Sequence, residues 1–172
     1  AAIDLTLDDI AVALNDRVTA TATVKNGVAS FGASSEFAMN VLAAPMNSAP
    51  THVLPAPATA TEDVALALAG VSVTDAESNV VSTALSVTHG VLTVDLGGGA
   101  AISAGVNGGA SLTLTGTQAQ INQALATLSY QGDTDYAGPD QLQILSTDDL
   151  GESTSDTLAI TVTAVNDAPV LG

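Results

Sequence analysis

The chain has 172 residues, of which 47% are hydrophobic and 2% aromatic, with no tryptophan and no cysteine. Eighteen acidic residues face two basic ones, Arg17 and Lys25, which gives a formal net charge of −16. This balance excludes nucleic acid as a partner, because phosphate binding needs Lys and Arg. No apolar run has the length of a membrane helix, so direct membrane insertion is excluded as well.

Strand patterns dominate the chain. The apolar residues are mostly Ala, Val, Leu and Ile, which suit a thin aliphatic core between two sheets. Gly- and Asn-rich turns separate short alternating segments, as in an antiparallel β-sandwich. The predicted strands are Thr19–Val24, Val64–Leu68, Val80–Val87, Val91–Leu96, Ser111–Thr115, Gln141–Leu145 and Asp156–Val165.

One short helix is predicted between the later strands. Thr117 and Gln120 have the spacing of a capping box, in which each side chain binds the backbone N–H of the other residue. Ile121, Ala124 and Leu128 then follow at helical spacing. We expect this helix to pack on an edge of the sandwich in a structural role.

A partial internal repeat divides the chain. Residues 31–50 match residues 150–169 in their apolar alternation, and each copy ends in Asn-Xaa-Ala-Pro. The predicted organisation follows from this match. Residues 1–46 form the last strands of a preceding, incomplete β repeat, residues 47–50 a linker, residues 51–165 a complete repeat, and residues 166–172 a linker to a next module.

The predicted fragment at residues 1–46 is too short to cover its own apolar face. About three strands would leave one face and one edge unpaired. Two explanations stay open. Either the fragment is a truncation of a longer protein, or a strand from another chain completes it.

Acidic residues occur in pairs two positions apart, as in Asp75 with Glu77 and Asp133 with Asp135. Carboxylates spaced in this way in a loop can converge on one hard cation, and Ca²⁺ takes six to eight oxygen ligands. The alternative is a solvated acidic coat that keeps the protein soluble. The composition alone leaves both interpretations open.

Four segments together resemble the cadherin-like repeats of large secreted bacterial adhesins, of the type that ends in Gly/Asp-rich calcium repeats. They are VSVTDAESN at residues 71–79, YQGDTDYAGPD at 130–140, STDDLG at 146–151 and AVNDAP at 164–169. The resemblance covers about residues 50–170. It implies an all-β fold, a cadherin-like or Ig-like Greek-key β-sandwich with one short helix, preceded by the partial β domain.

The same resemblance implies calcium at the junctions between modules. Ser48 stands where the second linker has Asp167, so we expect the N-terminal junction to bind more weakly. The implied ligands at the N-terminal junction are Asn47, Asp75, Glu77 and Asp149. Those at the C-terminal junction are Glu62, Asp133, Asp135, Asn166 and Asp167.

A catalytic role is not expected. The two histidines, His52 and His89, have no zinc-ligand spacing, and His89 is predicted to be an exposed turn residue. Glycosidases and lectins grip sugars with aromatic platforms, and this chain has only two Phe and two Tyr. We therefore predict that the protein is not an enzyme.

The functional expectation is an extracellular, cell-surface extender module of a bacterial adhesin, made rigid by calcium and supporting adhesion or biofilm. Two alternatives stay open: a filament or matrix subunit that assembles by strand donation, and a module that binds a glycan or protein with calcium. The expected partners are adjacent repeats or neighbouring copies, and a surface glycan or protein.

Overall fold

The computed structural model describes residues 17–18, 41–42 and 47–166, and the chain divides into two compact units, residues 1–46 and 47–172. In the first unit, β1 (Arg17–Val18) pairs antiparallel with β2 (Val41–Leu42). The predicted strand at residues 19–24 and most of the first copy of the predicted repeat lie outside the described residues.

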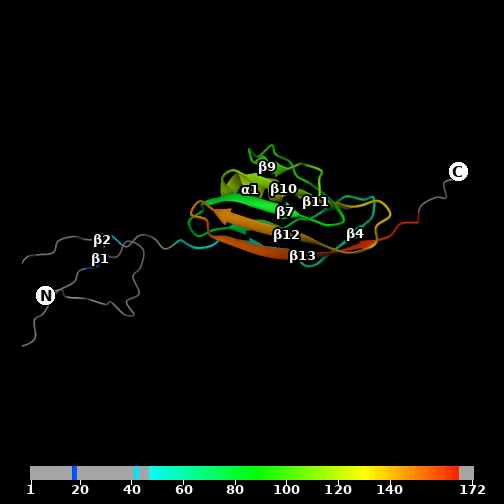
Figure 1. Ribbon diagram of the computed structural model, residues 1–172, viewed down its shortest axis with the longest axis horizontal. Coiled ribbons are helices and arrows are strands. Elements are labelled where there is room, and N and C mark those ends of the chain that lie inside the picture. Colours follow the sequence, from blue (N-terminus) through cyan, green and yellow to red (C-terminus); the bar gives the residue numbers. More distant parts are fainter. Residues whose placement is uncertain (1–16, 19–40, 43–46, 167–172) are drawn as a thin grey trace, which may run out of the picture. The chain divides into compact units, whose positions relative to one another are not determined.

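The second unit is built on a six-stranded sheet (Figure 1). β4 runs parallel to β13, and the other neighbours are antiparallel. The order across the sheet is β4 (Ala58–Thr61), β13 (Ser153–Thr163), β12 (Gly138–Asp148), β7 (Val80–Ser86), β10 (Ser111–Thr115) and β9 (Ala101–Gly105).

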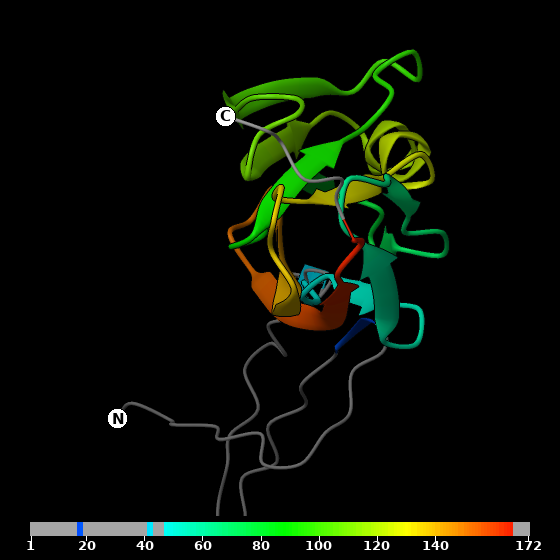
Figure 2. The ribbon, with the colours of Figure 1, turned by 90° about the vertical axis from the view of Figure 1, so that its right-hand side faces the viewer.

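Shorter strands and one helix form the layer behind this sheet, as the turned view shows (Figure 2). One group is a three-stranded sheet in the order β5 (Leu66–Ala67), β11 (Ser129–Gly132) and β8 (Gly90–Thr93). The other is β3 (Thr51–Val53) paired with β6 (Ser72–Thr74). The predicted β-sandwich with one short helix is confirmed.

The core between the layers is aliphatic, as the composition predicted. Its largest fully buried side chains are Leu and Ile, with Tyr130 the single exception. Tyr130 lies directly over Gly90, where an added Cβ would come within 2.6 Å of the ring and 2.4 Å of the Gln131 carbonyl oxygen. Only glycine fits there, which is why the β8 strand begins with one.

The predicted helix is confirmed as α1 (Gln118–Leu125). The Thr117 hydroxyl accepts from the Gln120 N–H at 3.3 Å, and the Gln120 side chain accepts from the Thr117 N–H at 2.9 Å. Asn122 fastens the helix to β6, because its side chain binds both the N–H and the carbonyl oxygen of Val73, at 2.9 and 2.7 Å. No helix within residues 47–166 is long and apolar enough to cross a membrane.

The strand predictions were right for the four central strands of the main sheet, β13, β12, β7 and β10, and weaker at its two edges and in the other layer. Ser111–Thr115 is β10 as predicted, whereas Gln141–Leu145 is the middle of the longer β12. Val64–Leu68 shrinks to the two residues of β5. The short strands β3, β4, β6, β9 and β11 were not predicted, since they alternate too few apolar residues to stand out.

Candidate functional site

One end of the second unit carries a network of acidic and amide side chains, here named the Asn47 cluster. Its members are Asn47, Asp75, Glu77, Asn79, Asp148 and Asp149. The Asn47 amide nitrogen donates to Asp148 at 2.6 Å, and the Asn79 amide nitrogen donates to Asn47 at 3.2 Å and to Asp149 at 2.6 Å. The four residues predicted for the N-terminal junction all belong to this cluster. Their role as calcium ligands stays a prediction.

Asp148, which the sequence analysis did not select, organises the loop between β12 and β13. Its Oδ1 accepts the N–H groups of Leu150 and Glu152, both at 2.9 Å. Burial opposes its ionisation, but these donors and the Asn47 amide outweigh burial and hold the pKa of Asp148 below its ordinary value. Its position in the STDDLG turn was the available signal.

Two buried acceptors in the Asn47 cluster have no hydrogen-bond partner. Asp75 is only 8% exposed, and its Oδ1 accepts from the Glu77 N–H at 2.8 Å while its Oδ2 has no partner. The Oδ1 of Asn79 is likewise buried and unpartnered. Buried polar atoms are normally satisfied, so these two oxygens are ones that a bound cation or water would complete.

Carboxylates alone do not form a metal site here. Within the described residues, no three His, Cys, Asp or Glu side chains are placed to hold one ion. A hard cation in the Asn47 cluster would therefore need amide and main-chain oxygens besides the Asp75 carboxylate, which is a ligand chemistry that calcium accepts. The two unpartnered oxygens, Asp75 Oδ2 and Asn79 Oδ1, are a carboxylate and an amide oxygen, which are both types of ligand that calcium accepts.

The residues predicted for the C-terminal junction are only partly gathered. Glu62 is buried, with Oε1 accepting from the Val165 N–H at 2.6 Å and Oε2 without a partner. Asp133 and Asp135 lie exposed in the turn between β11 and β12. Their neighbour Thr134 contacts Asp63, which is next to Glu62, at 3.4 Å. Asn166 follows β13, and Asp167 lies outside the described residues.

A second carboxylate network, centred on Asp140 near the start of β12, was missed by the sequence analysis. Asp140 is buried and accepts from the N–H groups of Thr88, His89 and Gln141, at 3.1, 3.0 and 2.8 Å. The Tyr130 hydroxyl lies 2.9 Å from Asp140 Oδ2 and 2.7 Å from the His89 carbonyl oxygen. No local pattern reveals these partners, since they come from three separate strands or turns.

The Asp140 network changes the acidity of both its titratable groups. Burial opposes ionisation of Asp140, but its hydrogen-bond donors prevail and lower its pKa. Burial, followed by the bond to Asp140, raises the pKa of Tyr130 far above its ordinary value. The pair is thus a carboxylate and a neutral phenol at all physiological pH values.

His89 is not the exposed turn residue that the sequence predicted. Its ring is half-buried and stacks on Tyr136, with 3.9 Å between ring centroids and 11° between planes. The Tyr136 hydroxyl in turn donates to the Pro139 carbonyl oxygen at 2.6 Å. Tyr136 belongs to a turn 47 positions further along the chain, so the contact depends on tertiary folding.

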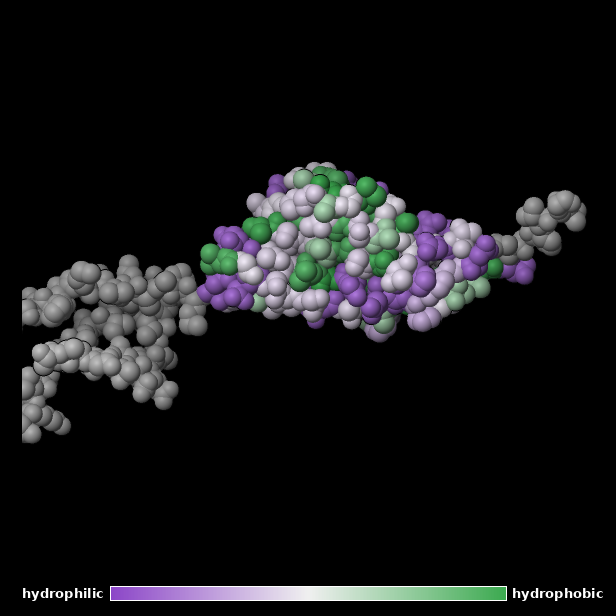
Figure 3. Space-filling model, viewed as in Figure 1, coloured by the Kyte–Doolittle hydropathy of each residue, from purple (hydrophilic) through white to green (hydrophobic). Residues whose placement is uncertain are grey.

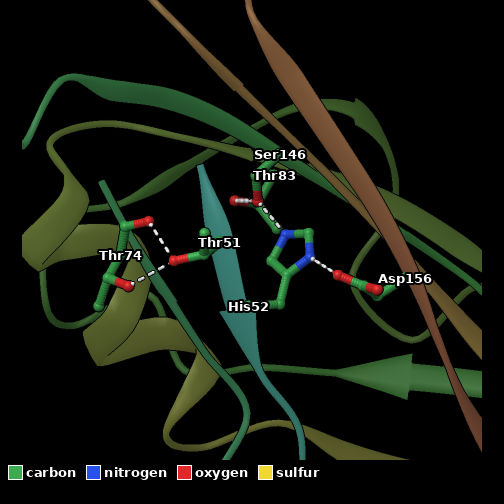
Figure 4. Close-up of polar contacts among 6 residues, drawn as sticks. All are labelled: Thr51, His52, Thr74, Thr83, Ser146 and Asp156. Carbon is green, nitrogen blue, oxygen red and sulfur yellow. Dashed lines mark hydrogen bonds and ion pairs between the residues drawn. The ribbon is translucent and has the colours of Figure 1, made fainter. Parts of the chain in front are cut away.

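His52 joins β3 to the main sheet through a chain of polar contacts (Figure 4). Its Nδ1 lies 2.8 Å from Asp156 Oδ2, and its Nε2 lies 2.9 Å from Ser146 Oγ. Ser146 Oγ also lies 2.8 Å from Thr83 Oγ1. The order acid, histidine, serine is that of a hydrolase triad.

Burial removes the catalytic meaning of this arrangement. The side chains of His52 and Ser146 are both 0% exposed, so no substrate reaches the serine. Ser146 is already bound to Thr83 as well as to His52. The contacts therefore connect strands and do not activate a nucleophile.

The family model described as Protein GAMETE EXPRESSED 2 domain matches residues 67–157, just over half of the chain. The matched range includes the Asp140 network and all of the Asn47 cluster except Asn47, while His52 and Glu62 precede it. No curated protein matches the chain.

The family match corrects the resemblance drawn from the four acidic segments. Those segments are short turn motifs that many β-sandwiches can share, whereas the model covers a continuous stretch of strands, turns and helix. The assignment to bacterial cadherin-like adhesin repeats is wrong. The expected role as an extender module of a bacterial adhesin is wrong too, as are its two alternatives, the filament subunit and the calcium-dependent binding module.

Proposed function

The chain belongs to the Protein GAMETE EXPRESSED 2 domain family, and we propose that it is an extracellular attachment module of a gamete protein. In this role it binds a partner at the gamete surface and catalyses no reaction. The name of the family supports expression in gametes, and the surface of the sandwich supports attachment.

The observation that carries the proposal is a broad exposed sheet face without charge. Strands β4, β7, β9 and β10 contain no charged residue. The charged residues of β12 and β13 are Asp140 and Asp148, which are buried, and Asp156, which reaches His52. We call the outward side of the six-stranded sheet the neutral face.

This absence of charge is unusual for so acidic a chain. The exposed acids of the second unit are concentrated in loops and turns, such as Asp63, Asp133 and Glu152. The carboxylates in these loops and turns, which form the rim of the neutral face, would repel anionic surfaces at long range. The neutral face itself allows close contact without desolvation of an ion. Charge depletion at the centre with a polar rim is the usual composition of a protein interface.

A direct test compares attachment to gametes and to somatic cells of one organism. Beads carrying the full chain are expected to bind gametes in excess over somatic cells. The variant Leu145→Asp places a charge on the neutral face and should reduce gamete binding several-fold. The matched variant Leu150→Asp adds the same charge in the turn between β12 and β13 and should leave it unchanged. Equal binding to both cell types would refute the proposal.

Calcium is the ion we propose for the Asn47 cluster. It would take the unpartnered Asp75 Oδ2 and Asn79 Oδ1, with further oxygens from the cluster and the backbone. Its charge would offset the mutual repulsion of Asp75, Glu77, Asp148 and Asp149. The bound ion would therefore stiffen the loops that hold these residues.

The calcium proposal predicts a metal-dependent melting temperature. Calcium at about a hundredfold excess over its dissociation constant should stabilise the fold by about 2.7 kcal/mol relative to the chelated protein. Asp75→Asn should lose most of this increment, while Asp95→Asn, which removes an exposed charge elsewhere, should keep it. Scanning calorimetry with calcium and with chelator measures both. Identical melting temperatures in the two buffers would contradict the proposal.

A further inference from the structure

The neutral face has a hollow lined mainly by small side chains. The hollow has a volume of about 280 Å³ and spans β7, β9, β10, β12 and β13. Small side chains form its floor and sides, among them Ala84, Ala104 and Ser111. Gly105 also borders the hollow. This position has no side chain, because an added Cβ would collide with the Ser111 carbonyl oxygen.

One large apolar side chain stands beside this hollow. Leu145 of β12 is 43% exposed and lines the hollow. It is the cross-strand partner of Ala84, which pairs with Thr113, which pairs with Ala104. Neighbouring strands are about 4.8 Å apart, so a projecting leucine and a depression floored by alanine lie side by side in one row.

A projection next to a hollow is self-complementary under two-fold symmetry. An axis passing between Leu145 and the hollow would place the Leu145 of each copy in the hollow of the other. Two-fold interfaces use one patch twice in this way, so that residue i contacts j and j contacts i. Sheets packed face to face meet about 10 Å apart, which suits side chains of this size.

The charges restrict the surface at which a second copy can approach. Two chains of net charge −16 repel each other wherever their rims meet. The neutral face is a region where copies can approach without opposing carboxylates. Its Ser, Thr and Gln side chains each donate and accept hydrogen bonds, so identical faces can satisfy one another. Figure 3 views this face. Pale and green residues cover much of its middle, and purple residues lie at its two ends and in its lower part just right of the centre.

We propose that two copies of this chain associate through the neutral face, with Leu145 of each copy seated in the partner's hollow. This inference rests on the proposed function in one respect, since it names a partner for the same face. Attachment between gametes would then be homophilic, with like chains meeting across the contact.

The test is the association state of the purified full chain by sedimentation equilibrium over a concentration series. The wild type should form dimers, and added salt should strengthen them by screening the acidic rims. Leu145→Asp should weaken dimerisation at least about tenfold, because it buries like charges at the contact. Leu150 is 72% exposed and lies off the neutral face. The variant Leu150→Asp should therefore dimerise as the wild type does.

A single engineered cysteine fixes the geometry. The chain has no cysteine, so any disulfide formed by one introduced thiol must join two copies. Ala84→Cys should cross-link under mild oxidation, whereas Ala67→Cys, exposed on β5 in the other layer, should stay monomeric.

The outcomes separate the inference from the function. A wild type that is monomeric at the highest soluble concentration, or equal cross-linking of the two cysteine variants, overturns the dimer. If such a monomer still binds gametes and loses binding on Leu145→Asp, the attachment proposal stands with a different partner. If the chain dimerises but does not bind gametes, the dimer proposal stands and the attachment function is refuted.

Discussion

Replacing Asp140 by asparagine is expected to lower the free energy of unfolding by about 3 kcal/mol at neutral pH. Asp140 is only 8% exposed, accepts three backbone N–H groups and faces the Tyr130 hydroxyl. An amide nitrogen in place of one carboxylate oxygen would present a donor to these donors. The loss includes the charge-assisted bonds and the unpaired groups left behind. Urea unfolding followed by circular dichroism measures it.

The pH dependence of this loss is fixed by the direction of the pKa shift. The pKa of Asp140 is lower in the folded protein than its ordinary value. Its stabilising contribution is therefore complete above the unfolded pKa of about 3.9 and disappears as pH falls through the folded pKa. The difference in stability between wild type and Asp140→Asn should be constant near pH 7 and should shrink below about pH 4.

A nearby exposed acid provides the control for Asp140. Asp133→Asn removes the same charge from the turn before β12, where the contacts to His89 and Tyr136 are made by its backbone. Its effect should stay within about 0.5 kcal/mol, the usual range for surface substitutions. Equal losses for the two variants at neutral pH, or a loss at Asp140 that does not shrink as the pH falls below about 4, would show that the buried carboxylate does not stabilise the fold in this way.

Replacing His52 by alanine should destabilise the protein by about 3 kcal/mol, through a cavity and through lost hydrogen bonds. The imidazole is fully enclosed and bridges Asp156 and Ser146, so its removal deprives both of a partner. β3 has only three residues and pairs with β6 alone, so it depends on this anchor. Hydrogen exchange should show β3 and β6 opening before the main sheet does.

The residue beside His52 provides a matched control on the same strand. Thr51 points outward and contacts the carbonyl and hydroxyl oxygens of Thr74, at 3.2 and 2.9 Å (Figure 4). Thr51→Val removes this exposed hydroxyl and keeps the shape of the side chain, so it should cost less than about 1 kcal/mol. If His52→Ala proved no more damaging than Thr51→Val, the enclosed histidine would not be the anchor of β3.

The acidic residues illustrate how far local pattern reaches. Loop spacing selected Asp75 and Glu77, and the family resemblance added Asn47 and Asp149. In the structure, Asn79 joins Asn47 to Asp149, while Glu77 accepts the N–H of Ser48, the residue next to Asn47. The sequence pattern did not distinguish Asp140 and Asp148 from the exposed acids around them. Both have neighbours in sequence that resemble any turn, and their burial depends on donors brought in by other strands.

The family likewise needed more than short motifs. Four turn-like segments suggested bacterial adhesin repeats, because acidic turns follow the same strand–turn rules in unrelated sandwiches. The match over residues 67–157 draws on the whole pattern of strands and helix and gave a different family. Motifs of six to eleven residues carried the chemistry of the loops but not the ancestry of the fold.

The sequence by itself determined the β-sandwich, the capped helix and the aliphatic core, because strand alternation and capping are properties of neighbouring residues. Tertiary structure alone decided the rest. It enclosed His52 with Ser146, surrounded Asp140 with donors, and turned every charge of six strands away from one face. Each of these depends on which strands become neighbours, and that pairing is set by packing between residues far apart in the chain.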